Sequence, residues 1–142
     1  GEHMTIITLP PHYKPSAKEE YMNDMQLAYF KQKLLDWRTE LMKGSENTLQ
    51  DLKETNLNEA DANDRASSES DQSLELRTRD RARKLIKKIN QALDRIEAGT
   101  YGYCEETGEP IGLKRLEARP VATLSIEAQE RHERKEKNFA EE

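Results

Sequence analysis

A single cysteine lies in a setting typical of a metal-binding knuckle. Cys104 ends the turn YGYC, and the second ligand of a Cys-x-x-Cys pair would fall at Thr107. A further pair with this spacing would fall at Ser125 and Ala128. A structural zinc ion needs four ligands, usually Cys or His. One thiolate with no suitably spaced histidine, His132 included, cannot close such a site. We therefore predict a zinc-independent protein with no bound metal and no resident cofactor.

Two carboxylates stand in a stretch that predicts a turn between helices. Asp61 and Asp64 belong to the sequence DANDRA, which ends at Ala66. Asp64 can cap the helix that follows, since Asp is a favoured N-cap residue. A calcium loop of the EF-hand type is excluded because its sixth position requires glycine, where this chain has Ala66. Besides capping, the pair could approach a metal-bearing or basic cavity of a partner.

The side chains do not form the pattern of a catalytic centre. His12 and His132 lack a carboxylate or nucleophile partner at useful spacing, and the sequence has no glycine-rich phosphate loop. We therefore predict that the protein is not an enzyme. Cys104 could be a redox sensor, but a small buried residue in a former metal knuckle is the favoured interpretation because the chain has no resolving cysteine.

Apolar residues at heptad spacing predict a long first helix. Leucines recur every seven residues within 17–55, which is the pattern of a helix packed against another helix. Ser16 and Glu19 form a capping box at its start. The proline-rich residues 1–16 predict an extended arm, of which 1–3 resemble an expression scar.

A second helix is predicted over residues 64–98, where apolar positions again follow three-four spacing. Gly99 follows it, and glycine commonly terminates helices. The two helices predict an antiparallel coiled-coil hairpin over residues 17–98, with its tip at about 56–66. Serines replace apolar residues near the tip, so we expect thin packing there.

Residues 99–142 predict a small domain followed by a helix. Glycines and prolines spread over 100–124 indicate a degenerate zinc-ribbon-like knot, and Ser125 is a suitable N-cap for a charged helix over 125–139. The fold class is therefore mainly α. Without a metal the knot must be held by packing, and its candidate core consists of Tyr101, Tyr103, Ile111, Leu113, Leu116, Val121, Leu124 and Ile126.

Composition limits the classes of partner. Hydrophobic residues make up 34% and charged residues 36%, a balance that suits an elongated helical protein. The net charge of −5 argues against a primary role on DNA or anionic lipid. The absence of an apolar run of ~18 residues and of a signal-peptide pattern favours a cytoplasmic protein with no membrane contact.

Charge is segregated along the predicted hairpin. Glu46 to Glu75 holds nine acidic and two basic residues, whereas Arg77 to Lys88 holds seven basic residues and one acidic residue, Asp80. Solvated helix faces are one interpretation. The other is a pair of surfaces for different partners, in which the basic stretch could also hold an anionic ligand such as a phosphate.

These segments together resemble the DksA/TraR family. The likeness lies in YMNDMQLAYFKQKLLDWRTEL, DANDRAS, SLELRTRDRARKLIKKINQAL, YGYC and PIGLKRLEARPVATL, and covers nearly everything from Glu20 to about Glu133. It implies a monomeric transcription regulator that binds RNA polymerase and does not bind DNA directly. It also implies that the hairpin enters the polymerase's secondary channel, contacts its rim, and changes open-complex stability together with ppGpp.

The resemblance also assigns roles to individual positions. The family's tip motif, Asp-x-x-Asp-x-Ala, matches Asp61, Asp64 and Ala66. Residues lining the family's ppGpp interface match Arg81, Leu85, Lys88 and Arg119. The four zinc-ligand positions match Cys104, Thr107, Ser125 and Ala128, so three ligands are lost. Gln129 stands where the family usually has a ppGpp-binding lysine, and we therefore expect weaker ppGpp coupling.

Two other functions remain open. A Gre-like factor would use the tip carboxylates to stimulate transcript cleavage by the polymerase, or would only occupy the channel. A coiled-coil scaffold would explain the heptads, although it leaves the tip motif and the LEARP segment unexplained.

Overall fold

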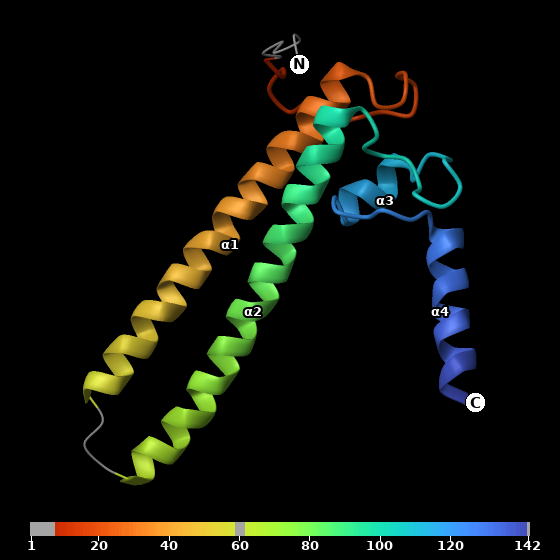
Figure 1. Ribbon diagram of the computed structural model, residues 1–142. Coiled ribbons are helices and arrows are strands. Elements are labelled where there is room, and N and C mark those ends of the chain that lie inside the picture. Colours follow the sequence, from red (N-terminus) through yellow and green to blue (C-terminus); the bar gives the residue numbers. More distant parts are fainter. Residues whose placement is uncertain (1–7, 59–61, 142) are drawn as a thin grey trace. The chain divides into compact units, whose positions relative to one another are not determined.

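The computed structural model describes residues 8–58 and 62–141, with side chains described for 8–44 and 70–138. The described residues form four helices, α1 (Asp24–Asn58), α2 (Ala62–Ala98), α3 (Leu113–Ala118) and α4 (Ile126–Glu141) (Figure 1). The chain divides into two compact units. Unit 1 contains the described residues up to Leu34 and from Gln91 onward, and unit 2 contains those between Leu35 and Asn90.

The two long helices expected from the heptads are present, and within each unit they run antiparallel and side by side (Figure 1). In unit 1 the Lys31 ammonium lies 3.6 Å from the Glu97 carboxylate across the pair. In unit 2 Arg38 Nη1 donates a hydrogen bond of 2.7 Å to Asn90 Oδ1. The mainly α architecture is therefore confirmed.

The first helix begins at Asp24, so the expectation of a helix from residue 17 is wrong. Asn23 is its N-cap, because Asn23 Oδ1 accepts a hydrogen bond of 2.9 Å from the Gln26 N–H. The residue before, Met22, has φ 53°, which no right-handed helix accommodates. The side chain of Gln26 is fully buried and accepts a bond of 2.8 Å from the Met22 N–H.

The capping box at Ser16 forms, but it closes an isolated turn. The Ser16 N–H donates to Glu19 Oε1 at 2.9 Å, and Ser16 Oγ accepts from the Lys18 N–H at 3.2 Å. The predicted capping box therefore forms, but the helix that it was expected to begin does not follow it. Its turn is held in place by the buried Gln26, whose Nε2 donates to the Ser16 carbonyl at 3.3 Å.

The N-terminal segment is not an extended arm from Tyr13 onward. The Tyr13 ring packs edge-on against Tyr29, with centroids 6.1 Å apart, and its hydroxyl donates a 2.7 Å bond to Glu19 Oε2. Burial and this bond raise the pKa of Tyr13 to about 12. The same bond lowers the pKa of the Glu19 carboxyl.

Two aromatic rings pack together in the core of unit 1, and half of the core residues predicted for the knot are buried. Tyr101 is 1% exposed, its ring lies 5.8 Å from that of Phe30, and its hydroxyl donates a 2.8 Å bond to the Pro120 carbonyl. Of the eight candidate core residues, four are buried: Tyr101, Ile111, Leu116 and Val121. Leu113 and Leu124 are half-buried.

Tyr103 and Ile126 were wrongly assigned to the core, since 38% and 54% of their surfaces are exposed. Tyr103 forms an isolated β-bridge with Pro110, and its ring packs edge-on against Tyr21, with centroids 5.6 Å apart. Ile126 begins α4 on its outward side. A short turn-rich segment has no regular hydrophobic period, so the sequence could not predict which of its side chains point into the core.

Two contacts fix the knot within unit 1. Glu117 of α3, which the sequence did not predict as a helix, bonds to Lys33 Nζ of α1 at 2.8 Å and also accepts a bond from the Tyr29 hydroxyl. The Tyr21 hydroxyl donates to the Gly102 carbonyl at 2.7 Å and accepts from the Gly112 N–H at 3.0 Å. Side chains before and within α1 therefore hold the loop and α3.

The thin packing expected at the tip falls largely on side chains outside the described ones, and Leu74 and Leu76 are the described leucines nearest to it. Ile89 is fully buried near the boundary of unit 2, whereas Leu74 and Leu76 are 58% and 45% exposed. Met42 on α1 is 46% exposed. Among the described helices, none is long and apolar enough to cross a membrane.

Candidate functional site

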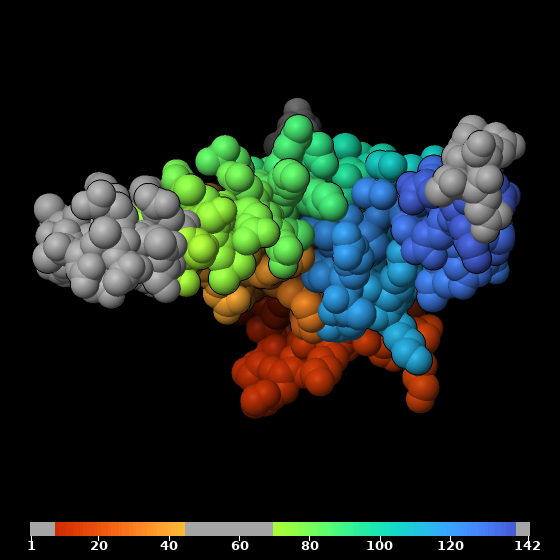
Figure 2. All heavy atoms as spheres, turned by 90° about the horizontal axis from the view of Figure 1, so that it is seen from below, coloured from red at the N-terminus to blue at the C-terminus, as the bar shows by residue number. Residues whose placement is uncertain are grey.

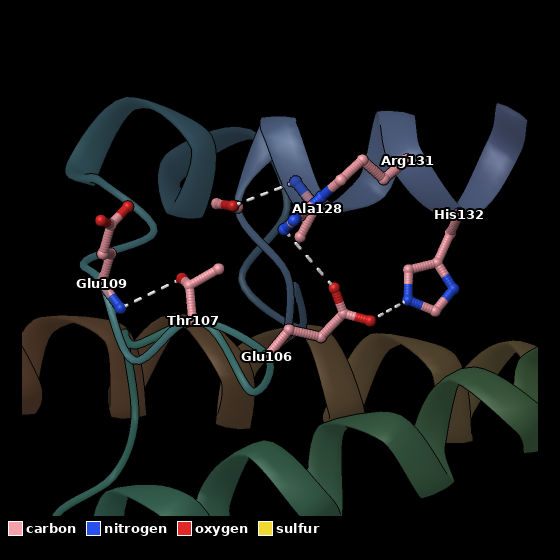
Figure 3. Close-up of polar contacts among 7 residues, drawn as sticks. Glu106, Thr107, Glu109, Ala128, Arg131 and His132 are labelled. Carbon is pink, nitrogen blue, oxygen red and sulfur yellow. Dashed lines mark hydrogen bonds and ion pairs between the residues drawn. The ribbon is translucent and has the colours of Figure 1, made fainter.

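The loop after Cys104 is a tight turn closed by backbone hydrogen bonds. The Cys104 N–H donates to the Glu109 carbonyl at 2.8 Å, and the Gly108 N–H donates to the Cys104 carbonyl at 2.9 Å. Gly108 has φ 74°, a conformation that favours glycine. Thr107 Oγ1 accepts a 3.2 Å bond from the Glu109 N–H (Figure 3). We call residues 104–109 the knuckle loop.

The second pair of former ligand positions lies at the start of α4. Ser125 is the N-cap, as expected, because its Oγ accepts a 3.2 Å bond from the Ala128 N–H (Figure 3). Ala128 is fully buried and Cys104 is 3% exposed. The Cys104 sulfur accepts bonds from the Thr107 hydroxyl and the Ser125 N–H. The structure therefore brings all four positions together.

The donors at these positions do not fit zinc. Ala128 offers only a methyl group, and the hydroxyls of Ser125 and Thr107 are engaged in the hydrogen bonds of the loop and the helix start. In the part of the chain that the structure describes, no three or more His, Cys, Asp or Glu side chains are grouped as metal ligands. A neutral hydroxyl pair and one thiolate are not a tetrahedral zinc set.

The environment of Cys104 favours its thiolate. Burial alone would raise the pKa of the thiol, but hydrogen bonds from the Thr107 hydroxyl and from the N–H groups of Ser125, Thr107 and Glu106 lower it to about 6. The donors that would surround a metal-bound sulfur thus stabilise a bare sulfur anion.

We expect this thiolate to make stability depend on pH. The folded pKa, about 6, lies below the ordinary value of 9.0, so the stabilisation is full above pH ~9 and is lost as pH falls to about 6. Urea denaturation of the parent at pH 9, 7.5 and 6 should show a falling free energy of unfolding. In Cys104→Ser the free energy of unfolding should fall less over the same pH range. An equal fall in the two proteins would contradict the prediction.

A polar cluster, which the sequence gave no reason to expect, joins the knuckle loop to α4. Glu106 Oε2 lies 3.7 Å from Arg131 Nη2, and Glu106 Oε1 contacts His132 Nε2 (Figure 3). The His132 contact, ahead of the charges of Arg131 and Lys135, lowers the pKa of the Glu106 carboxyl against the opposing effect of desolvation. The sequence analysis gave His132 no carboxylate partner, and this expectation is wrong, because Glu106 is its partner.

The expected anion-binding residues lie in both units. Arg81, Leu85 and Lys88 are spaced to share one face of α2 in unit 2, where Arg81 and Lys88 are exposed and Leu85 is half-buried. Arg119, also exposed, is the C-cap of α3 in unit 1. Gln129 of α4 is half-buried, and its Nε2 donates a 3.3 Å bond to Glu133 Oε1.

The tip motif is described only in part. Asp61 lies outside the described residues. Asp64 and Ala66 lie in the first turns of α2, and their side chains are outside the described ones. Because α2 begins at Ala62, Asp64 is inside the first turn and is not the residue that precedes it, as the capping interpretation required. A carboxylate in the first turn still suits the helix dipole.

Two sequence families match the chain in succession. The family described as "DnaK suppressor protein DksA, N-terminal domain" matches residues 26–96, and the "Prokaryotic dksA/traR C4-type zinc finger" matches residues 99–134. The chain is 62% identical over 133 residues to the RNA polymerase-binding transcription factor DksA of Caulobacter vibrioides, which covers 94% of each chain. The chain belongs to the DksA family.

Other DksA proteins extend this likeness. The chain is 45% identical to the DksA of Escherichia coli K12, over 90% of this chain and 85% of that one. The solved structure of transcription factor DksA2 from Pseudomonas aeruginosa is similar with a TM-score of 0.78 and 44% identity, over 87% of this chain and 94% of that one. Within the DksA family, this member matches the C4-type zinc finger but retains one cysteine.

Proposed function

We propose that the chain is a transcription regulator that binds RNA polymerase through its secondary channel and changes the stability of promoter open complexes together with ppGpp. The observation that carries this is the 62% identity, over 94% of both chains, to a relative named as an RNA polymerase-binding transcription factor. The two long helices supply the elongated element that such a channel requires. At 1.5 Å per residue, α2 with its 37 residues extends over about 55 Å.

The proposed polymerase contacts divide between the tip and the basic part of α2. Asp61, Asp64 and Ala66 act at the polymerase active centre, and Arg81, Leu85 and Lys88 face ppGpp at the channel rim with Arg119. The exposure of Arg81, Lys88 and Arg119 supports this, because an anion must reach their charged ends.

The protein acts as a cytoplasmic monomer, contacts no nucleic acid directly and carries no catalytic activity of its own. Its net charge of −5 supports the absence of DNA binding, since phosphate contacts need a basic surface. Its C-terminal domain works without zinc, because Thr107, Ser125 and Ala128 replace three ligands.

The test is transcription from a ribosomal RNA promoter by purified polymerase, with and without ppGpp, using the parent before and after dialysis against a chelator. We expect inhibition that increases with ppGpp and does not change after chelation. RNA cleavage in stalled complexes would instead indicate a Gre-like factor. Binding without any effect on transcription would indicate a factor that only occupies the channel.

We expect Gln129→Lys to strengthen ppGpp binding to the protein–polymerase complex by roughly three- to tenfold, because it restores one charge-assisted phosphate contact. Gln91→Lys, which adds the same charge at an exposed position of α2, is the matched control and should change the affinity little. The measurement is a ppGpp titration of each complex. An unchanged affinity in Gln129→Lys would contradict the assigned role of this position.

A further inference from the structure

A C4-type zinc finger uses one ion to join two segments, and in this chain the first segment keeps one cysteine, Cys104, whereas the second keeps none. The first is the knuckle loop and the second is the start of α4 (Ile126–Glu141). α4 is a surface helix whose described side chains are exposed from Glu130 onward, as the space-filling view illustrates (Figure 2). Among its described side chains, Ala128 is buried and Gln129 half-buried, which gives the helix a narrow contact, so other contacts must fix its direction.

Three kinds of contact join the two segments. The Glu105 N–H donates a 2.9 Å bond to the Thr123 carbonyl just before α4. The Ser125 N–H donates to the Cys104 sulfur. Both act before the helix begins and leave its direction unfixed. The third contact, from Glu106 to Arg131 and His132, acts beyond the first turn of α4 and can fix that direction.

We propose that the Glu106 carboxylate, held by Arg131 and His132, replaces the zinc ion as the link that fixes α4 on the knuckle loop. Both carboxylate oxygens are used, one for each partner (Figure 3). The two partners are neighbours on α4, so their side chains hold the carboxylate from two directions. Lys135, one turn beyond Arg131, adds a positive charge that attracts Glu106.

The proposal predicts that the strength of this link depends on salt concentration and not on a bound metal. The side chains of Glu106, Arg131 and His132 are 40%, 50% and 47% exposed, so water and ions reach them. Exposed ion pairs are screened when salt shortens the range of electrostatic attraction to a few ångströms. A tetrahedral zinc site would respond to chelators and hardly to sodium chloride.

Hydrogen exchange in the full chain tests the link. In Glu106→Gln we expect amides of the knuckle loop and of the first two turns of α4 to exchange roughly two- to tenfold faster than in the parent, while those around Phe30 stay unchanged. Glu105→Gln is the matched control, since it removes the same charge from the neighbouring exposed position and keeps the Glu105 N–H bond. Equal acceleration in both variants would overturn the proposal, as would none in Glu106→Gln.

Two further arms separate the link from general charge effects. The parent should exchange faster in these segments at 0.5 M than at about 0.05 M sodium chloride, and Glu106→Gln should lose that difference. Arg131→Gln with Glu106→Gln should be less than additive, because the two substitutions remove one interaction. Additive effects, or slower exchange of these segments on adding zinc to the parent, would overturn the proposal.

Discussion

Asp64→Asn is expected to abolish the effect of the protein on promoter complexes while leaving its affinity for RNA polymerase within about twofold of the parent. The substitution keeps the shape of the side chain and removes its charge. The tip is a small part of a hairpin whose helices span 35 and 37 residues, so most of the binding area must lie elsewhere. The charge, by contrast, is the property that a polymerase active centre would sense.

The measurement pairs open-complex lifetime on a ribosomal RNA promoter with direct polymerase binding. Asp71→Asn is the matched control, because it makes the same chemical change at an exposed position of α2 beyond the tip motif. It should retain activity. Parallel loss of binding and activity in Asp64→Asn would refute this division, and full activity would move the function toward a scaffold.

Gly102→Ala should destabilise the protein by about 2–4 kcal/mol, the largest loss we expect from adding a single methyl group. Gly102 has φ 92°, and a Cβ at this residue would lie 2.8 Å from Met22 Cγ and 2.9 Å from Met22 Sδ. The backbone of Met22 is held by its N–H bond to the buried Gln26, so only a rotation of the Met22 side chain could relieve the contact. The cost therefore combines backbone strain with overpacking.

Gly108→Ala separates these two costs. Gly108 has φ 74°, but nothing lies within 4 Å of the Cβ that would be added. It should therefore lose only the backbone part, about 1–2 kcal/mol. Chemical denaturation of the parent and both variants measures the difference. If the two variants lose equal stability, Met22 moves aside freely and the close packing described here carries no cost.

Helices with a regular hydrophobic repeat and local caps could be predicted from the sequence, whereas contacts between distant residues could not. Heptad leucines predicted the hairpin because a buried helical stripe must recur along the chain. Ser125 was predicted as the α4 N-cap because capping is local. Helix α1, however, begins at Asp24, because a tertiary contact from the buried Gln26 decides where the N-terminal turn ends. Ser16 and Asn23 both carry local capping signals, and no local rule chooses between them.

The candidate site divides in the same way. The four positions that match the family's zinc ligands were assigned from the resemblance, and the structure brings these positions together. The partnership of Glu106 with His132 spans 26 positions with no repeat between them, so the sequence gave no sign of it. The exposure of Tyr103 was missed because an irregular loop has no period that separates inside from outside.

The Tyr21 hydroxyl has a consequence for where the smallest autonomous fragment starts. It forms hydrogen bonds with both Gly102 and Gly112. A residue that precedes the described helices therefore holds in place two turns that lie 81 and 91 residues later in the chain. A fragment that begins at the first residue of α1 would keep each described helix intact but would lose the hydrogen bonds of Tyr21. Trimming by helix boundaries would thus remove part of the fold. The protease-resistant fragment should begin upstream, near Tyr13, whose ring packs against Tyr29 of α1.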